Sequence, residues 1–309
     1  MSKLWDAIVI GAGPAGASCA VWLKQLGFEP LLLEAAEQPG GLLCTHSYPD
    51  IWTITNPSQT GKEMATLMLR QIEVAGVDLR CHTAVTRVQR LATGEVDQLD
   101  GFAVTTRQVE SGQIHTERAR FVVVASGVTA RRPDEVDPHN TFEQVVFGPG
   151  EAVMHGQYDG QTVAILGGGD NAFENYLYVA SKGAKQVDVF ARTIRAQQQF
   201  IRQVPQERVF LGPVQYDLAQ RTVNGRRYDQ ILVFYGWAPN VSFLADFSLA
   251  RDERGFLQVD ALTTQTSEPG LFAIGEVTQR MHPCVPTAMA DGVIAAKAIE
   301  KCFAQMDDQ

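Results

Sequence analysis

The feature that most constrains this chain is a glycine motif near its start, which reads G-x-G-x-x-G through Gly11, Gly13 and Gly16. An apolar run over residues 5–10 precedes the motif, and a helical pattern follows it as far as Gly27. In this context the first glycine permits a tight turn, the second lets a pyrophosphate approach the backbone, and the third lets helix and strand pack closely. The start of the helix adds free N–H groups and a partial positive charge. The sequence therefore predicts a dinucleotide site at this turn.

A second apolar strand, residues 31–33, supports the same prediction because it ends on an acid. Glu34 lies 23 residues after Gly11. This spacing places a carboxylate where it can accept hydrogen bonds from a ribose diol. A glycine-rich turn in an ordinary α/β protein would not account for the acid.

The same pattern recurs in the second half of the chain. Three glycines at 167–169 follow an apolar strand, and a helical pattern then runs to Gly183. Sixteen residues separate the first of these glycines from Gly183, and sixteen separate Gly11 from Gly27. This internal repeat predicts an α/β fold with two Rossmann-like nucleotide-binding domains.

The second copy of the repeat differs from the first at the position of the acid. Phe190 occupies the position equivalent to Glu34. Arg192 and Arg195 follow it, and guanidinium groups suit the extra phosphate of NADP. The alternative is that both arginines are solvated surface charges.

Other segments of the sequence predict the elements that complete the two domains. We expect a helix over 61–75, a buried strand over 121–125 and a final helix over 286–303. The stretch 131–160, rich in proline, glycine and charge, is typical of a connection into the second domain. Short strands are expected to form a small antiparallel unit from residues 77–79, 85–88, 102–106 and 113–116.

Composition limits the function classes open to the chain. Its 309 residues are enough for two domains, and a net charge of −9 argues against nonspecific nucleic-acid binding. No apolar run is long enough to cross a bilayer and no signal peptide is visible, so we expect a cytoplasmic protein that binds no membrane. Five cysteines without regular spacing give neither a disulfide framework nor a zinc site, so no metal is expected.

Two further motifs connect the chain to a known family. Ala125-Ser126-Gly127 ends the buried strand, and Gly275-Glu276 ends a later apolar strand. With the first glycine motif, they resemble the low-molecular-weight thioredoxin-reductase group of FAD-dependent pyridine nucleotide–disulfide oxidoreductases. The resemblance implies two three-layer ββα domains and a homodimer. It places an FAD-binding domain at 1–130 and 239–309, around an inserted NAD(P)-binding-like domain at 131–238.

The resemblance also implies which residues contact the nucleotides. The FAD contacts come from the first motif, the acid, and the loops and strand ends around them: Gly11, Gly13, Pro14, Ala15, Gly16, Glu34, Gly41, Leu42, Tyr48, Asn56, Val85, Ala125, Gly127, Gly275, Glu276, Cys284 and Val285. A second nucleotide, either NADP or a second FAD, would lie against Gly167, Gly169, Asp170, Asn171, Arg192 and Arg195.

One departure from the family pattern bears on the chemistry. Thioredoxin reductases carry a C-x-x-C pair on the inserted domain, and the matching positions here are Gly150 and Val153. No cysteine lies between Cys81 and Cys284, so electrons cannot pass through that dithiol. We therefore expect an FAD-dependent oxidoreductase that is not an ordinary thioredoxin reductase.

Two groups of relatives lack the pair. In the thioredoxin-reductase-like ferredoxin–NADP reductases, the tyrosine of a dipeptide resembling Tyr48-Pro49 stacks on the flavin. This group implies electron transfer through FAD between NADPH or ferredoxin and a protein or disulfide acceptor, with ferredoxin, flavodoxin or a thioredoxin-like protein as partner. The other group, the cyanobacterial diflavin-linked disulfide oxidoreductases, implies a nicotinamide-independent enzyme with a second flavin in the inserted domain.

Three residues are candidates for chemistry beside the flavin. They are Tyr48, Cys44 in the loop after Glu34, and Cys284 before the final helix, where a helix start can activate a thiol. The alternative is that both cysteines are small buried hydrophobic residues. A different class of function also stays open, a flavin-binding sensor or docking protein that lost catalysis with the dithiol.

Overall fold

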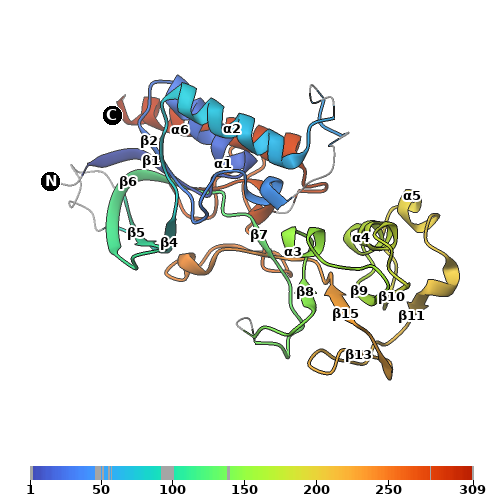
Figure 1. The fold of residues 1–309 in the computed structure, drawn as a ribbon. Helices are drawn as coiled ribbons and strands as arrows, with labels where there is room; N and C mark the ends of the chain where they lie inside the picture. The colour runs from blue at the N-terminus through green and yellow to red at the C-terminus, as the bar shows by residue number, and fades with distance from the viewer. Residues whose placement is uncertain are drawn as a thin grey trace. The chain divides into compact units, whose positions relative to one another are not determined.

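The computed structural model describes residues 3–45, 50, 52–54, 56, 58–91, 101–137, 140–278 and 280–307. The chain divides into two compact units (Figure 1). Unit 1 consists of Met1–Val128 and Pro239–Gln309, and unit 2 consists of Thr129–Ala238.

Unit 1 is built on a seven-stranded mixed sheet with the order β3-β2-β1-β6-β5-β4, in which β17 also pairs with β6. The pairs β3–β2, β2–β1, β1–β6 and β6–β17 are parallel, and β5 is antiparallel to both β6 and β4. The strands are Leu4–Ile10 (β1), Pro30–Leu33 (β2), Asp78–Arg80 (β3), Thr83–Arg90 (β4), Phe102–Gln108 (β5), Ile114–Val124 (β6) and Leu271–Ala273 (β17).

Strand β6 corrects one expectation from the sequence. Residues 113–116 and 121–125 are expected in two separate strands, but Ile114–Val124 is one strand of 11 residues. Its first half pairs with β5 and its second half with β17, so it joins the antiparallel and parallel parts of one sheet. The exposed first half lacks the alternating apolar pattern by which a strand is recognised. The short strands therefore extend the main sheet and do not form a separate unit.

Three helices pack together on one face of this sheet (Figure 1): α1 (Pro14–Gln25), α2 (Gly61–Ala75) and α6 (Val285–Asp307). Helix α2 begins with a capping box, in which the Thr60 hydroxyl accepts the N–H of Glu63 and the Glu63 carboxylate accepts the N–H of Thr60. It ends at Gly76, which has a left-handed φ of 70°. Helices α1 and α6 cross closely at Gly292. A Cβ on this glycine would lie 2.5 Å from the carbonyl oxygen of Ala15, so a larger residue would not fit.

Both faces of the unit 1 sheet are buried. Ala7 and Val9 of β1 face the helices, whereas Ile8 and Ile10 pack on the opposite side, where Leu244 of the short helix η3 (Ser242–Leu244) also lies. Burial on both faces explains why β1 and the second half of β6 read as nearly continuous apolar runs.

Unit 2 is a three-layer ββα domain. Its parallel sheet has the order β11-β10-β9-β15-β8. Helix α4 (Asp170–Ser181) and the short α3 (Glu151–Met154) pack on one face, and a small antiparallel sheet packs on the other. The strands are Val145–Phe147 (β8), Thr162–Leu166 (β9), Gln186–Ala191 (β10), Val209–Leu211 (β11), Tyr216–Asp217 (β12), Thr222–Val223 (β13), Arg226–Arg227 (β14) and Gln230–Val233 (β15).

The segment 131–160 is more than the connection that its composition indicates. It supplies β8, an edge strand of the unit 2 sheet, and helix α3. Both elements are too short for a periodic pattern to identify. The remaining short elements are α5 (Gln198–Ile201), η2 (Gln206–Arg208), and β7 (Val128–Ala130) and β16 (Trp237–Pro239), which pair with each other. The predicted α/β class, with two nucleotide-binding sheets, is confirmed.

Candidate functional site

The first glycine motif lies where β1, α1 and the end of β6 meet. Gly11 has a φ of 100°, and a Cβ on it would lie 2.5 Å from the carbonyl oxygen of Ala125. A Cβ on Gly16, in the first turn of α1, would lie 1.9 Å from the carbonyl oxygen of Gly11. Both positions therefore exclude any larger residue, as the motif requires.

Gly13 differs from these two glycines because the space beside it is open. It caps α1 with a φ of −70°, and a Cβ there would have no atom of the described residues within 4 Å. Pro14 follows in the first turn of the helix, and no side chain caps the helix start. The uncapped start of α1 thus lies next to a space that the described residues leave open, which suits a pyrophosphate.

The predicted acid is held against this turn by the backbone. Glu34 Oε2 accepts the N–H of Ala12 at 2.8 Å, and Oε1 accepts the N–H of Ala36 at 2.9 Å. Each oxygen keeps a second lone pair with which it can accept a ribose hydroxyl. The start of β4 is bonded to the same residue, because the N–H of Thr83 donates to the carbonyl oxygen of Glu34 at 2.8 Å. Val85 lies two residues further along β4.

The loop after Glu34 returns to the glycine turn. The N–H of Gly40 donates to the carbonyl oxygen of Ala12 at 2.9 Å, and a Cβ on Gly41 would lie 3.3 Å from the Cα of Gly13. Gly41 starts a short 3-10 helix, η1 (Gly41–Thr45), which contains Leu42 and Cys44. The Cys44 thiol is half-buried and donates to the carbonyl oxygen of Pro39 at 3.3 Å.

Two further predicted contacts follow this loop in the chain. Tyr48, the predicted stacking residue, lies outside the described residues, as does Pro49. Asn56 is buried, and its amide donates to the carbonyl oxygen of Gln59 at 3.4 Å. Within the described part of the chain, Asn56 Oδ1 is one of two buried side-chain oxygen or nitrogen atoms without a hydrogen-bond partner. A buried acceptor of this kind is unusual unless a ligand or water completes it.

The end of β17 approaches the glycine turn from the other half of unit 1. Gly275 has a φ of 72°, and a Cβ on it would lie 2.9 Å from the Cβ of Ala15. It starts a short 3-10 helix, η4 (Gly275–Thr278), that carries Glu276. Burial raises the pKa of the Glu276 carboxyl, and no described residue donates a hydrogen bond to it. A ligand hydroxyl that donates to this carboxylate would offset its desolvation.

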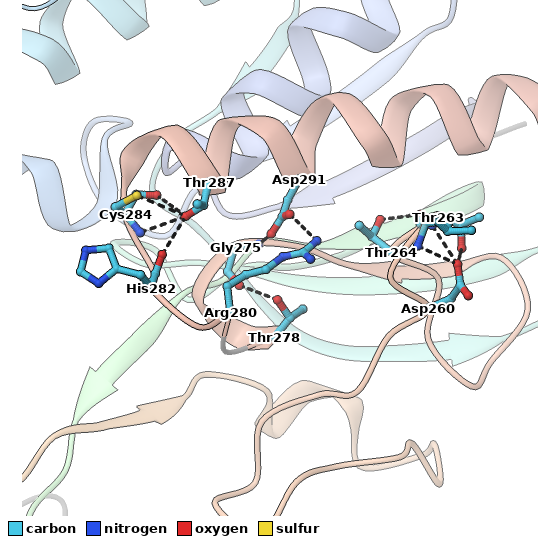
Figure 2. A network of polar contacts seen from close by, with 11 residues as sticks. Asp260, Thr263, Thr264, Gly275, Thr278, Arg280, His282, Cys284, Thr287 and Asp291 are labelled. Atoms are coloured by element: carbon cyan, nitrogen blue, oxygen red, sulfur yellow. Dashed lines mark hydrogen bonds and ion pairs between the residues drawn. The ribbon is translucent and has the colours of Figure 1, made fainter. Parts of the chain in front are cut away.

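The start of α6 lies close to η4. The N–H of Cys284 donates to the Thr287 hydroxyl at 3.0 Å, and the Cys284 sulfur lies 3.4 Å from the same oxygen (Figure 2). Val285 begins the helix. Cys284 and Glu276 border one small cavity with Asp291. Cys44 and Cys284 are both free thiols.

The predicted A-S-G strand end also lies in unit 1. Ala125 and Gly127 follow β6, and Ala125 contacts Gly11 as described above. The Ser126 hydroxyl donates to the carbonyl oxygen of Asn240 at 2.6 Å, and the N–H of Asn240 donates to the carbonyl oxygen of Gly127 at 3.0 Å. The strand end is therefore fixed by the point where the chain re-enters unit 1.

The glycine turn of unit 2 repeats the geometry of the first. A Cβ on Gly167 would lie 2.5 Å from the carbonyl oxygen of Phe234, whereas a Cβ on Gly169 would meet no atom of the described chain within 4 Å. Gly169 caps α4, and no side chain caps that helix start. Asp170 is committed to the following loop, because its carboxylate accepts the backbone and side-chain N–H groups of Gln197 at 2.7 and 3.0 Å. Asn171 follows it in the first turn of α4.

The end of β10 and the residues after it differ from the residues that follow β2. Phe190 is buried and stacks on Phe210 with ring centroids 5.0 Å apart, so it belongs to the core. The N–H of Arg195 donates to the carbonyl oxygen of Gly168 at 2.6 Å, which holds this loop against the glycine turn. Both Arg192 and Arg195 are exposed, and no described carboxylate lies within ion-pair distance of either. Their guanidinium groups are therefore available to an anion.

Two polar residues that the sequence analysis did not select border the same cavity as Glu276. Asp291 is buried in α6, and Arg280 donates to its carboxylate. The signal was present in the sequence, because Asp291 shares the apolar face of the final helix with Ala288, Ala295 and Ile299. A charged residue on such a face indicates a buried polar contact.

Two absences hold for the part of the chain that the structure describes. It contains no cluster of three or more histidine, cysteine, aspartate or glutamate side chains that could bind a metal. None of its helices combines the length and the apolar character needed to cross a membrane.

Sequence comparison identifies the family that this fold and these two turns define. The family described as pyridine nucleotide-disulphide oxidoreductase matches residues 5–209 and 214–292. The chain belongs to this family, and it is therefore an oxidoreductase of the thioredoxin reductase and ferredoxin–NADP reductase type.

The similar proteins include both ferredoxin–NADP reductases and thioredoxin reductases. The chain is 30% identical over 302 residues to the ferredoxin–NADP reductase of Granulibacter bethesdensis, an alignment covering 88% of this chain and 81% of that protein. It is 28% identical over 337 residues to the thioredoxin reductase of Streptomyces coelicolor, covering 100% of this chain and 97% of that protein.

Solved structures show the same fold. The thioredoxin reductase of Lactococcus lactis superimposes with a TM-score of 0.77 at 23% identity, over 97% of this chain and 99% of that one. The bacillithiol disulfide reductase of Bacillus cereus gives a TM-score of 0.79 at 19% identity, over 97% and 100%. The fold of this chain is thus thioredoxin-reductase-like, with two nucleotide-binding sheets.

Proposed function

We propose that this chain is an FAD-dependent oxidoreductase that works without a C-x-x-C pair and passes electrons through FAD between NADPH or ferredoxin and a protein or disulfide acceptor. The observation that carries the proposal is the open space at Gly13, at the uncapped start of α1 and next to the Ala12–Glu34 hydrogen bond. A pyrophosphate at that helix start and a ribose at that carboxylate are what an FAD presents.

The residues around the turn fit the rest of an FAD. In this assignment the Glu276 carboxylate accepts a hydroxyl of the flavin's sugar-alcohol chain, and the buried Asn56 Oδ1 gains the donor that it lacks. Cys284, Val285 and the start of α6 lie at the flavin end of the site, where the helix dipole favours negative charge. When bound, FAD supplies the hydride and electron chemistry, and the protein supplies position and electrostatics.

The acceptor is proposed from what the chain lacks and from one relative. Unit 2 contains no cysteine, so the dithiol of thioredoxin reductases has no counterpart there. The relative that is 30% identical is a ferredoxin–NADP reductase. We therefore favour a ferredoxin or flavodoxin partner for a homodimeric enzyme, with NADPH in unit 2 between the open Gly169 and the exposed Arg192 and Arg195.

A second candidate is a nicotinamide-independent disulfide oxidoreductase with a second flavin in unit 2. It is favoured by the sequence after β10, where Thr193 and Ile194 separate Arg192 from Arg195, and by the core position of Phe190. In this candidate Cys284 or Cys44 would exchange electrons with the flavin of unit 1, and Tyr48 would cover that flavin.

One set of assays separates the candidates. The FAD released from the purified protein by denaturation is counted per chain, and the holoenzyme is then assayed with NADPH and oxidised ferredoxin, and separately with reduced ferredoxin and a disulfide. The proposal expects one FAD per chain and ferredoxin reduction by NADPH that survives Cys44→Ser and Cys284→Ser. Two flavins per chain, with disulfide reduction that Cys284→Ser abolishes, would replace it with the second candidate. A protein that binds FAD but turns over with neither pair would be the flavin-binding sensor.

A further inference from the structure

The small cavity beside Glu276 in unit 1 is bordered by an ion pair, between the partly exposed Arg280 and the buried Asp291, that the proposed function does not use. Asp291 lies in the second turn of α6, and its side chain is only 4% exposed. Asp291 Oδ2 accepts the N–H of Gly275 at 3.1 Å, and Oδ1 accepts a hydrogen bond from Arg280 Nη2 at 2.5 Å (Figure 2). One carboxylate thus binds two points on a different segment of the chain.

These two points are the ends of the segment that carries Glu276. Gly275 begins η4, and its carbonyl oxygen accepts the Thr278 hydroxyl at 2.8 Å. Arg280 follows that turn. Because Asp291 is part of α6, the pair fixes Glu276 relative to the helix whose start carries Cys284.

The guanidinium also borders the cavity itself. Arg280, Asp291, Glu276 and Cys284 all line it, together with Gly275 and Thr287. The Arg280 side chain is 33% exposed, so its charge is only partly screened by water. The charged groups that face this cavity are one cation and two anions, and the partial positive charge of the α6 start adds to the cation.

This partly buried pair is neutral only while both members are present. Removal of one member leaves the other as an uncompensated charge in a poorly solvated place. A flavin gains negative charge when a reductant gives it two electrons and one proton at neutral pH. A cation near the flavin therefore favours reduction, and an anion opposes it.

We propose that Arg280 and Asp291 are positioning residues that hold Glu276 against the start of α6 and together keep the charge at the flavin end of the site balanced, which sets the reduction potential of the bound FAD. The inference rests on the proposed function, because it takes Glu276 and the α6 start as the flavin end of an FAD site. It assigns a role to two residues that do not themselves carry electrons.

The test compares midpoint potentials of the bound flavin in Arg280→Gln, Asp291→Asn and the double variant. Each holoenzyme is reduced slowly with xanthine and xanthine oxidase in the presence of a reference dye, at one fixed pH for all variants. The expected shifts have opposite signs: Asp291→Asn raises the potential, Arg280→Gln lowers it, and the double variant returns close to the wild type. Arg280→Lys, which keeps the charge, stays near the wild type.

A matched control is Arg254→Gln, which removes an arginine from a surface ion pair with Asp252 in the same unit. Its potential is expected to equal that of the wild type. Shifts of the same sign in Arg280→Gln and Asp291→Asn, or no shift in either, would overturn the inference. Opposite shifts support it, because a loss of structure alone would not make the sign of the potential shift depend on the sign of the charge removed. Arg280→Gln keeps a hydrogen-bond donor at a partly exposed position, so it tests the inference even where Asp291→Asn does not fold.

The failure of the proposed function gives a different result. If the wild-type protein contains no FAD, the proposed function fails before any potential is measured. If FAD is present in one copy per chain and the two single variants do not shift in opposite directions, only the ion-pair inference is wrong.

Discussion

Glu34 and Ala12 are 22 residues apart in the chain, and a 2.8 Å hydrogen bond from the Ala12 N–H to Glu34 Oε2 joins them. This bond connects the end of β2 to the glycine turn between β1 and α1. The other oxygen of the same carboxylate accepts the N–H of Ala36. The acid that the motif places for a ribose is therefore also a structural part of the turn.

We predict that Glu34→Gln weakens both folding and FAD binding. A glutamine can accept only one of the two N–H groups, and its own NH₂ faces the other. The unmet bond should cost about 1–3 kcal/mol of unfolding free energy in the apoprotein, measured by urea denaturation. Glu37→Gln, at an exposed position nearby, is the control and should change neither quantity. A Glu34→Gln variant as stable as the wild type would contradict the role assigned to the carboxylate.

Two glycines of the first motif should respond to alanine in opposite ways. Gly13→Ala should leave the stability of the apoprotein almost unchanged, because its φ of −70° suits alanine and its Cβ would meet no atom of the described residues within 4 Å. The same Cβ would enter the space assigned to the pyrophosphate, so FAD should bind roughly tenfold or more weakly, a loss of about 1.4 kcal/mol. FAD titration by quenching of flavin fluorescence measures this.

Gly16→Ala is the counterpart, because its Cβ would lie 1.9 Å from the carbonyl oxygen of Gly11. Overpacking against backbone should cost about 3 kcal/mol or more of unfolding free energy. Unchanged FAD affinity in Gly13→Ala would show that no phosphate lies at that helix start.

We predict that the contribution of Glu276 to the stability of the apoprotein depends on pH. Burial raises the pKa of its carboxyl above the ordinary value of 4.5. Because the folded-state pKa is the higher one, Glu276 contributes stability below the unfolded pKa, and this contribution is lost as the pH rises through the folded pKa. Glu276→Gln should therefore have a higher Tm than the wild type near pH ~7, and the two should converge near pH ~4. Equal Tm values for the two apoproteins at neutral pH would mean that the carboxylate is not desolvated.

The two arginines after β10 should determine whether the protein prefers NADPH or NADH. If NADP binds in unit 2, Arg192→Ala and Arg195→Ala should each raise the KM for NADPH by roughly tenfold, the effect of about 1.4 kcal/mol, and leave that for NADH unchanged. Arg202→Ala, another exposed arginine of unit 2, is the control. Gly169→Ala should impair both cofactors without loss of FAD, because its Cβ would occupy only the open space at α4. Equal changes in the KM for NADPH and the KM for NADH would mean that these arginines do not recognise the extra phosphate of NADP.

The parts of the structure that follow from local chemistry could be predicted from the sequence. The turns at Gly11 and Gly167 and the helix over 61–75 are fixed by residues close in sequence, and the structure has them where expected. The continuity of β6 could not be seen, because its first half is exposed and its partners, β5 and β17, come from distant parts of the chain.

The site shows the same division. The spacing of Glu34 from Gly11 is a property of the repeat, so the residue could be identified without a structure. The pairing of Arg280 with Asp291 depends on how η4 packs against α6 and appears only in three dimensions. The aspartate on the apolar face of α6 was the one sign of it in the sequence.

The most direct test of the central claim is an anaerobic titration of the purified protein with NADPH and then with NADH, with FAD counted per chain and flavin absorbance followed near ~450 nm. The proposal predicts one FAD per chain and rapid bleaching by NADPH. A protein that holds FAD but is bleached by neither nicotinamide would contradict the assignment of NADPH to unit 2. A protein without FAD would contradict the assignment of the flavin to unit 1.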